Sequence, residues 1–595
     1  MDRYRPPLDD IRFSLAHEVP LTRLTAEPAL AVADPDTVAG LLEEAGRFAA
    51  EVIAPTDRVG DREGARLVDG GVVLPEAFRT AYAQYVASGW GAVQHPEAFG
   101  GGGFPLLVAT AVKELITTAN MAFSLGPLLT TGAVHLLTHH GSEDQRARWL
   151  PRMVTGEWTG TMNLTEPQAG SDLGAVTARA EPVGDGSYRV FGQKIYITYG
   201  DHDLAEQVVQ LVLARLPDAP PGTKGISLFI VPKRMVGPDG APGEANDVRV
   251  VSIEHKLGIH ASPTCVMAYG EGGDGAWAEL VGDPHDGMRQ MFTMMNDARL
   301  GVGLQGLAVA ERAVQRAEAY ARERTQGRAV GTPPGTQSPI VAHPDVRRTL
   351  LEARAQIDAM RALCYANAHA LDLAQHAGDA DERARQQALA DLLTPLSKAW
   401  CTDLGVELTS EALQVFGGMG YVEETGVAQQ FRDARIAPIY EGTNGIQAID
   451  LVGRKLPMED GGLVARVLDG LLAELDGAPD AVAELVPPVV AAAGLARDLA
   501  AELLEMRDDP RDALAGATPY LRVLATVIAT ALVVRGLVAA ERARAAGEAV
   551  DAGLLAARTA RARVLVRRVL PRVHGLAAAV RAGAADLYAE GTPAA

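Results

Sequence analysis

The sequence predicts an α+β protein in which helical domains lie before and after a small β domain. Three observations along the chain support this fold class. Apolar residues recur at spacings of three and four from residue 36 to about 157, alternate in short β-rich runs from about 159 to 279, and return to the helical period after Met288. Because 595 residues exceed what one hydrophobic core usually holds, several packed domains are expected.

The first two domains follow an N-terminal extension at residues 1–35. A helical domain is expected at 36–157, where the apolar face is formed by Val38, Leu41, Leu42, Ala45 and Phe48. A β domain, either a barrel or a sandwich, is expected at 158–280. Glycine and proline clusters there separate β-rich runs at 188–191, 208–213, 226–231 and 248–253.

The second half of the chain is expected to be helical throughout. Long periodic segments predict a four-helix bundle at 281–456, and the polar break at 457–465 reads as a linker. Residues 466–595 are long enough for an additional antiparallel helical domain. Their apolar run at 523–534 is shorter than the roughly 20 residues that span a bilayer, so it predicts a buried helix and no membrane span.

Composition narrows the classes of function. A formal charge of −20 opposes general attraction to nucleic acid, which needs clustered basic residues. The three cysteines are widely spaced, so neither a disulfide framework nor a zinc site is indicated. His255 and His260 lack partners at ligand spacing and are interpreted as structural, so no metal is predicted. The N-terminus lacks a secretory pattern, and a cytoplasmic location is expected.

The segment 439–443, Ile-Tyr-Glu-Gly-Thr, is the leading candidate for chemistry. A carboxylate shielded from bulk water has a pKa raised toward neutrality, as a base for an α-proton requires. Tyr440 could limit the access of water, and Gly442 leaves no side chain beside a substrate. If Glu441 stood alone, it would be interpreted as a solvated loop residue. The motifs at 414–418 and 164–172 favour a catalytic role instead.

Together these motifs, Gln-Val-Phe-Gly-Gly and Leu-Thr-Glu-Pro-Gln-Ala-Gly-Ser-Asp, resemble the acyl-CoA dehydrogenase family over most of the chain, from about residue 34 to 455. The resemblance implies FAD as cofactor and Glu441 as the catalytic base. It assigns substrate contacts to Ser171, Arg299, Tyr440 and Gly442. It assigns cofactor contacts to Met162, Leu164, Thr165, Gly170, Ser171, Tyr196, Thr198, Arg324, Gln414, Gly418 and Thr443.

The activity implied by the resemblance is α,β-dehydrogenation of an acyl-CoA to a trans-2-enoyl-CoA. Glu441 would take the α-proton while hydride passes to the flavin, and an electron-transfer flavoprotein would accept the electrons. Fatty-acid β-oxidation or related acyl-CoA catabolism is the expected setting. An acyl-CoA oxidase remains an alternative, since it needs the same base and cofactor.

The additional C-terminal helices resemble those of larger bacterial members of the family, which act on broad fatty acyl chains or on methylthiopropanoyl-CoA. That resemblance favours a homodimer, with a tetramer as the alternative. A basic segment there includes Arg558, Arg561, Arg563, Arg567, Arg568 and Arg572. A solvated face beside acidic surface is the preferred interpretation. Because a DNA-binding branch of the family also has extra helices, nucleic-acid binding stays as a second hypothesis and anionic lipid as a third.

Overall fold

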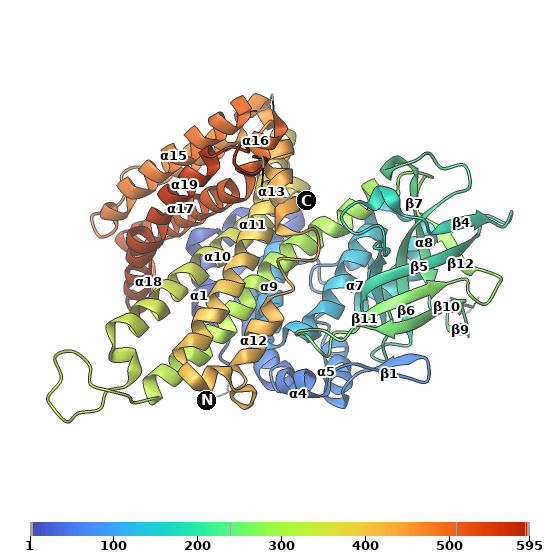
Figure 1. Ribbon diagram of the computed structural model, residues 1–595, viewed down its shortest axis with the longest axis horizontal. Coiled ribbons are helices and arrows are strands. Elements are labelled where there is room, and N and C mark those ends of the chain that lie inside the picture. The colour runs from blue at the N-terminus through green and yellow to red at the C-terminus, as the bar shows by residue number, and fades with distance from the viewer. Residues whose placement is uncertain (1–3, 238–239, 507–508, 590, 592–595) are drawn as a thin grey trace. The chain divides into compact units, whose positions relative to one another are not determined.

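The computed structural model describes residues 4–237, 240–506, 509–589 and 591. The chain forms two compact units (Figure 1). Unit 1 comprises Met1–Gly46, Pro105–Thr118 and Arg299–Ala595, and unit 2 comprises Arg47–Phe104 and Ala119–Ala298. The boundary falls inside the long helix α9 (Gly287–Glu323), which contributes to both. Along the chain, helices are followed by a β domain and then by further helices, as the sequence predicts. The predicted fold class is therefore confirmed.

The helices of unit 2 precede its sheet in the chain. The start of α8 shows why its sequence begins a helix there. The Ser142 side chain accepts a hydrogen bond from the Gln145 backbone N–H, and the Gln145 side chain accepts one from the Ser142 backbone N–H. This capping box satisfies two backbone amides that would otherwise lack partners. The apolar face of these helices supplies part of the core that the strands complete. The helices are α4 (Thr56–Glu63), α5 (Glu76–Ala87), α7 (Met121–His140) and α8 (Glu143–Thr155).

The main sheet among the described residues of unit 2 has eight strands, of which seven follow the order β10-β11-β5-β12-β7-β6-β3 and the eighth, β4, pairs with both β5 and β6. Among the strand pairs that the structure describes in this sheet, β3–β6 and β4–β6 are parallel and the others are antiparallel. Strand β5 (Tyr188–Thr198) pairs with three neighbours and is the longest. The others are β3 (Trp158–Asn163), β4 (Arg179–Pro182), β6 (Gln207–Arg215), β7 (Ile226–Pro232), β10 (Val248–Ile253), β11 (Thr264–Tyr269) and β12 (Ala276–Leu280).

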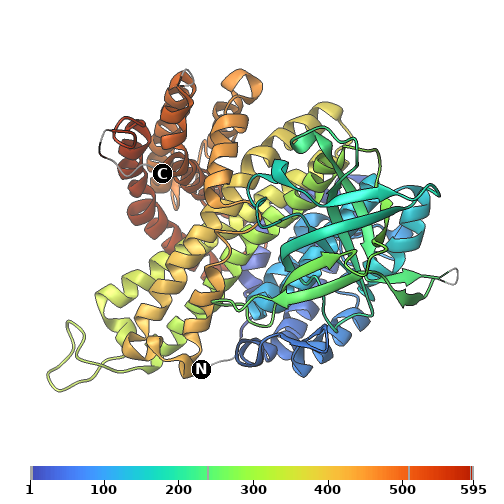
Figure 2. The same cartoon turned by 45° about the vertical axis from the view of Figure 1, so that its right-hand side comes forward.

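Unit 1 is built on long helices that pack closely. At Gly303 a Cβ atom would lie 2.7 Å from the Ser397 carbonyl oxygen, and at Gly306 it would lie 2.3 Å from that of Cys401. Glycine at these positions therefore allows α9 to approach α11. Figure 2 shows the loop between α9 and α10 extending clear of these helices. The helices are α6 (Leu106–Ala119), α10 (Pro344–His376), α11 (Ala380–Val415), α12 (Val427–Ala434) and α13 (Asn444–Asp450).

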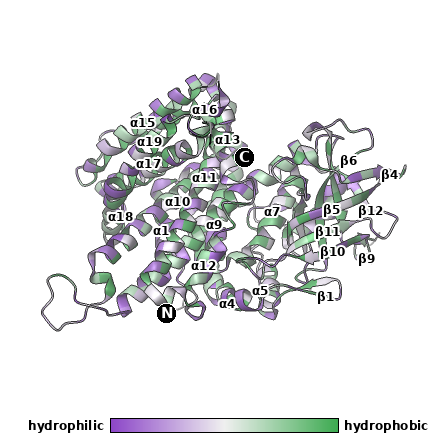
Figure 3. Ribbon diagram, in the orientation of Figure 1, coloured by the Kyte–Doolittle hydropathy of each residue, from purple (hydrophilic) through white to green (hydrophobic). Residues whose placement is uncertain are grey.

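The additional C-terminal helices are grouped around α17 (Ala517–Ala545), which packs against α10, α11 and α13. Within the described residues, α7 and α17 are long and apolar enough to cross a membrane, but 78% and 89% of their most apolar windows are buried. The apolar colouring of α17 in Figure 3 is therefore explained by packing. Its neighbours are α14 (Leu463–Ala473), α15 (Val486–Glu505), α16 (Pro510–Ala515), α18 (Ala552–Val564) and α19 (Val573–Arg581).

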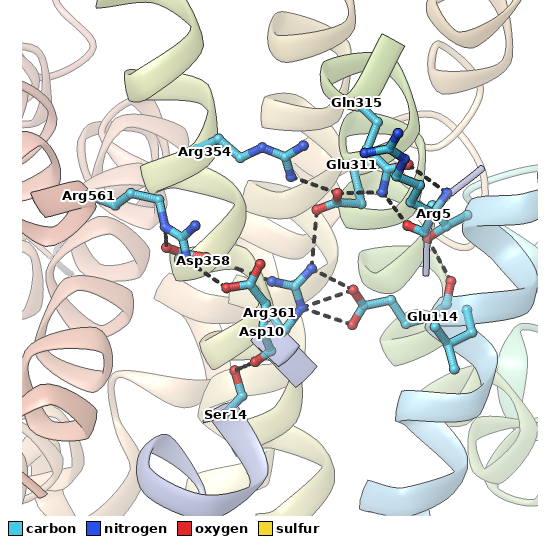
Figure 4. A network of polar contacts seen from close by, with 12 residues as sticks. Arg5, Asp10, Ser14, Glu114, Glu311, Gln315, Arg354, Asp358, Arg361 and Arg561 are labelled. Atoms are coloured by element: carbon cyan, nitrogen blue, oxygen red, sulfur yellow. Dashed lines mark hydrogen bonds and ion pairs between the residues drawn. The ribbon is translucent and has the colours of Figure 1, made fainter. Parts of the chain in front are cut away.

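A network of buried charges holds the N-terminal segment to the bundle. Arg361 lies at its centre, 2.7 Å from Glu114 and 3.3 Å from Glu311 (Figure 4). We call the following set the N-terminal ion-pair network: Asp10, Glu18, Glu114, Glu311, Glu318, Arg354, Asp358, Arg361, Arg558 and Arg561. Because α1 (Leu8–Phe13) and the π-helix at Ser14–Glu18 carry Asp10 and Glu18, they are joined directly to the additional helices.

Candidate functional site

Glu441 lies in a short loop between α12 and α13 whose backbone is strained. Its φ is 57°, a left-handed conformation that is unusual for a residue with a side chain, and φ of Gly442 is 81°. A Cβ atom on Gly442 would also lie 2.8 Å from the Gln447 side-chain nitrogen. Thr443 then begins α13 by accepting a 3.3 Å hydrogen bond from the Ile446 N–H. The loop is thus fixed at its C-terminal end by a helix cap.

Glu441 is half-buried, and desolvation of its carboxyl group controls its charge. Desolvation raises its pKa to about 7, while the positive charges of Arg299 and Lys398 act in the opposite direction. We call Glu441, Arg299 and Lys398 the catalytic cluster. A carboxylate with a pKa near neutrality can both hold and release a proton at physiological pH, which is the property a general base needs.

Lys398 is a member of this cluster that the sequence analysis did not single out. Its side chain is fully buried on α11, and its Nζ donates a 2.8 Å hydrogen bond to Asn444 Oδ1. Burial lowers the pKa of Lys398 to about 7, although Glu441 and Asp403 favour the charged form. The sequence offered one indication of this role, a lysine within a largely apolar segment of a predicted helix. A lysine is rarely buried unless it is paired.

Three residues of unit 1 that were predicted to contact the substrate lie around Glu441. The Tyr440 hydroxyl donates to Gln305 on α9, and burial followed by the Glu441 charge raises the tyrosine pKa above its usual range. Burial lowers the pKa of Arg299, while Asp450 and Glu441 raise it. Arg299 Nη2 lies 3.8 Å from the position of a Cβ on Gly442. Tyr440, Gly442 and Arg299 therefore border the loop that carries Glu441.

The predicted flavin loop of unit 2 follows β3, the strand that contains Met162. The Thr165 carbonyl accepts a 2.9 Å hydrogen bond from the Ile195 N–H, which joins this loop to β5. Beside it, the buried Glu166 carboxylate accepts from Lys194 Nζ at 2.8 Å and from the Thr177 N–H, also at 2.8 Å. Although burial opposes it, the Lys194 charge and these hydrogen bonds lower the pKa of Glu166 to about 2. Sequence analysis gave neither Glu166 nor Lys194 a role, and both fix the loop that carries Leu164 and Thr165.

The surface beside this loop fits a flat aromatic cofactor. Tyr196 has a φ of 59° and its side chain is 61% exposed, although a large ring is normally buried. Thr198, at the end of β5, is partly exposed. Gly170 and Ser171 are exposed, and nothing lies within 4 Å of a Cβ built on Gly170. An open ring face beside hydroxyls and small residues is suited to stacking and hydrogen bonding with a flavin.

The remaining predicted cofactor residues belong to unit 1 and are exposed. Arg324 is at the start of the loop between α9 and α10, 3.3 Å from the Gln326 side-chain oxygen. Gln414 and Gly418 are at the C-terminal end of α11, with nothing within 4 Å of a Cβ on Gly418. Thr443 is exposed on the Glu441 loop. An exposed guanidinium can take a diphosphate, as predicted for Arg324.

The two histidines interpreted as structural differ in what surrounds them. The His260 ring nitrogens lie 2.8 Å from the Asp61 carbonyl oxygen and 3.0 Å from that of Lys256, so hydrogen bonding within unit 2 accounts for this residue. His255 is exposed in the loop between β10 and β11. Over the part of the chain that the structure describes, no group of three or more His, Cys, Asp or Glu is arranged to hold a metal.

Most of the basic C-terminal segment is paired with acidic residues. Arg563 and Arg567 both contact Glu484, and Arg572 contacts Glu352. Arg558 corrects the expectation of a solvated face, because its side chain is 1% exposed and contacts Glu18, Asp10 and Asp358 of the N-terminal ion-pair network. Guanidinium groups that are already neutralised internally are poorly suited to phosphate backbones or anionic lipid.

Most of the chain is similar to known proteins. Family descriptions match in order: acyl-CoA dehydrogenase N-terminal domain at 36–157, middle domain at 161–270, C-terminal domain at 285–456, and an acetyl-CoA dehydrogenase C-terminal-like domain at 465–589. A 3-methylmercaptopropionyl-CoA dehydrogenase of Ruegeria pomeroyi is 46% identical over 574 residues, 95% of this chain and 96% of that protein.

Two further proteins are similar over most of the chain. A broad-specificity linear acyl-CoA dehydrogenase of Mycobacterium tuberculosis is 36% identical over 78% of this chain and 77% of its own length. The structure of an acyl-CoA dehydrogenase from Bacillus anthracis complexed with FAD superposes with a TM-score of 0.73, at 20% identity, over 91% of this chain and 88% of that one. The additional helices therefore have counterparts in known structures.

Proposed function

The chain belongs to the acyl-CoA dehydrogenase family, and from that premise we propose that Glu441 removes the α-proton of its acyl-CoA substrate. The protein is an oxidoreductase that uses FAD. The observation that supports the role of Glu441 is its position: the residue is half-buried in a fixed loop beside Arg299 and Lys398, and desolvation raises the pKa of its carboxyl group to about 7. Such a group is unprotonated often enough at neutral pH to accept a proton, and basic enough to keep it.

The neighbouring residues fit the removal of an α-proton from a thioester. Arg299 and Lys398 place positive charge near the site where enolate charge would develop. Tyr440, anchored to Gln305, limits the access of water to one side of the base. FAD, when bound, supplies the acceptor for the β-hydrogen, which leaves as hydride. The product of this dehydrogenation is a trans-2-enoyl-CoA.

A short linear acyl-CoA, with 3-methylmercaptopropionyl-CoA as first candidate, is the proposed substrate. The 46% identity over nearly the whole length of both proteins supports this choice over long acyl chains. The relative with broad specificity for linear acyl-CoA supports a wider range that includes fatty acyl groups, and thus a role in β-oxidation. Both substrates present the same α- and β-carbons to the base and the flavin.

Three further proposals concern the setting of the reaction. Electron-transfer flavoprotein is the proposed acceptor, in keeping with dehydrogenase rather than oxidase relatives. A cytoplasmic location agrees with cysteines that are all free thiols. A homodimer is proposed because α17 covers faces of α10 and α11, which are then withdrawn from contact with a second dimer. The mass of the holoenzyme in solution, measured by light scattering, separates a dimer from a tetramer.

Anaerobic reduction of the bound flavin tests the activity. Purified holoenzyme is mixed with acyl-CoA thioesters of increasing length and with 3-methylmercaptopropionyl-CoA, and the loss of visible flavin absorbance is followed. Fast reduction by the sulfur-containing and short linear thioesters is expected. Reduction by long chains alone would overturn the substrate proposal. Rapid production of hydrogen peroxide in air would instead identify an oxidase.

A further inference from the structure

The side chain of Asn444, three residues after Glu441, is held by hydrogen bonds from one face of α11. Its Oδ1 accepts from Lys398 Nζ at 2.8 Å. Its Nδ2 donates to the Ala399 carbonyl oxygen at 3.0 Å and to Asp403 Oδ1 at 2.7 Å. An amide that uses both its oxygen and its nitrogen in this way has one fixed orientation. The start of α13, and with it the loop that carries Glu441, is consequently attached to α11.

The other oxygen of Asp403 faces the additional domain. Arg522 on α17 donates to Asp403 Oδ2 at 3.0 Å and to Glu407 at 3.1 Å. The Asp403 side chain is only 21% exposed and that of Arg522 is 36% exposed, so solvent screens this pair incompletely. Helix α17 also packs directly against α11 and α13. A continuous series of polar contacts thus runs from α17 through Asp403 to Asn444.

We propose that the additional C-terminal domain positions the catalytic base through Arg522, Asp403 and Asn444, which we call the loop relay. Arg522 and Asp403 are positioning residues: Arg522 orients the Asp403 carboxylate, which orients Asn444, which holds the loop of Glu441. The relay also sets the charge near the base, since Asp403 favours the protonated form of Lys398. The effect on reactivity rests on the proposed function of Glu441, whereas the effect on loop order does not.

Several ionisable groups surround the base and determine the direction of the pH effect. They come from each element that packs against the loop: Arg299 on α9, Lys398 and Asp403 on α11, Asp433 on α12, Tyr440 in the loop itself, and Asp450 and Arg454 at the end of α13 and beyond it. Arg522 adds one positive charge to this set from α17, and its removal favours protonated carboxyl groups throughout the cluster.

The test compares two variants that break the relay at different contacts. Arg522→Met removes a positive charge, so the acid limb of flavin reduction against pH should move to higher pH and the rate at pH 7 should fall several-fold. Asp403→Asn keeps an oxygen that can accept from Asn444 but removes the negative charge that favours protonated Lys398. Because a neutral Lys398 no longer favours the Glu441 carboxylate, the acid limb should again move to higher pH. Arg544→Met is the matched control, because Arg544 lies on the same helix and pairs with Glu541.

Hydrogen–deuterium exchange of the holoenzyme provides a readout without substrate. Arg522→Met should raise exchange in residues 436–450, while the interior of α17 stays as protected as in wild type and in Arg544→Met. The proposal is overturned if this segment exchanges at the wild-type rate and if neither variant moves the pH profile. If wild-type protein reduces no flavin with any acyl-CoA, the proposed function fails while the exchange result still decides the relay.

Discussion

Two groups of charged side chains in unit 1 differ in how completely their charges are balanced. In the N-terminal ion-pair network, Arg361 is fully buried and lies within 3.3 Å of two glutamates. Burial opposes its charge, yet Glu114 and Glu311 raise the pKa of Arg361 above its usual value. In the catalytic cluster, burial prevails, and the pKa values of Glu441 and Lys398 are both about 7.

This difference separates a structural role from a chemical one. Desolvation acts on both groups, and close opposite charges with good geometry decide whether the ionised form survives. Around Arg361, where guanidinium and carboxylate groups meet directly, the ionised forms persist, and the contacts of the network fix the N-terminal segment and α18, although burial still raises the pKa of Glu18. At Glu441, nearby positive charge does not fully offset the desolvation of the carboxylate. The carboxyl group can therefore gain and lose a proton at neutral pH, as a base requires.

The largest effect is expected from replacing Glu441, the proposed base of the catalytic cluster. Glu441→Gln removes the proton acceptor and keeps the size of the side chain, so flavin reduction should slow by about 10²–10⁴-fold. FAD content and acyl-CoA binding should stay near wild type. Stopped-flow absorbance under anaerobic conditions measures the rate, and Glu505→Gln, an exposed change on α15, is the control. Wild-type rates in Glu441→Gln would disprove the assignment.

The second largest effect is expected from disrupting the N-terminal ion-pair network. Arg558→Met would leave Glu18 buried without its guanidinium partner, while Asp358 keeps Arg561, and removing one partner of a buried ion pair costs about 3–5 kcal/mol in the free energy of unfolding. Arg563→Met is the matched control, because its pair with Glu484 is exposed to solvent and should contribute little to the free energy of unfolding. Urea unfolding followed by circular dichroism measures both. Equal losses would show that burial does not distinguish the two pairs.

A third prediction sharpens the comparison through pH. Glu441 must be unprotonated to act, so kcat/KM should rise with pH and level off above about 7. Lys398→Met removes a positive charge that favours the carboxylate, so the pKa of Glu441 should rise and the acid limb should move to higher pH. Lys224→Met, a change in unit 2, should leave the profile unmoved. A limb at the ordinary pKa of glutamate would contradict the role of burial.

The smallest expected effect concerns an exposed charge. If Arg324 contacts the FAD diphosphate, Arg324→Ala should weaken FAD retention by about tenfold, equivalent to ~1.4 kcal/mol. Equilibrium dialysis of the released flavin measures this change. Unchanged retention would assign the diphosphate to other groups, and the control Arg322→Ala alters an exposed arginine two residues away that pairs with Glu318.

Sequence reasoning reached the fold class because helical and strand periodicities differ along the chain, and it singled out Glu441 as the candidate base because that residue lies in a local motif. It missed Lys398, Asp403 and Arg522, since their roles depend on contacts between helices far apart in the chain. Arg558 was misjudged for the same reason. Its partners come from the first twenty residues and from α10, and no local pattern connects them.

The reasons for particular residues also changed once their backbone was known. Gly442 was interpreted as leaving room for substrate, and its positive φ together with the nearby Gln447 side chain provides a conformational reason as well. The resemblance assigned Tyr196 a contact with the cofactor. Its exposed side chain agrees with that prediction without testing it. Periodicity alone would have left Tyr196 as an ordinary strand residue.

Proton removal can be observed separately from hydride transfer with acetyl-CoA, which has α-hydrogens but no β-carbon. Holoenzyme is incubated with acetyl-CoA in D₂O, and deuterium in the acetyl group is followed by mass spectrometry for wild type and Glu441→Gln. The account predicts incorporation by wild type, faster as the pH rises through about 7, and none above background by the variant. Equal incorporation by the two proteins would contradict the assignment of Glu441 as the base.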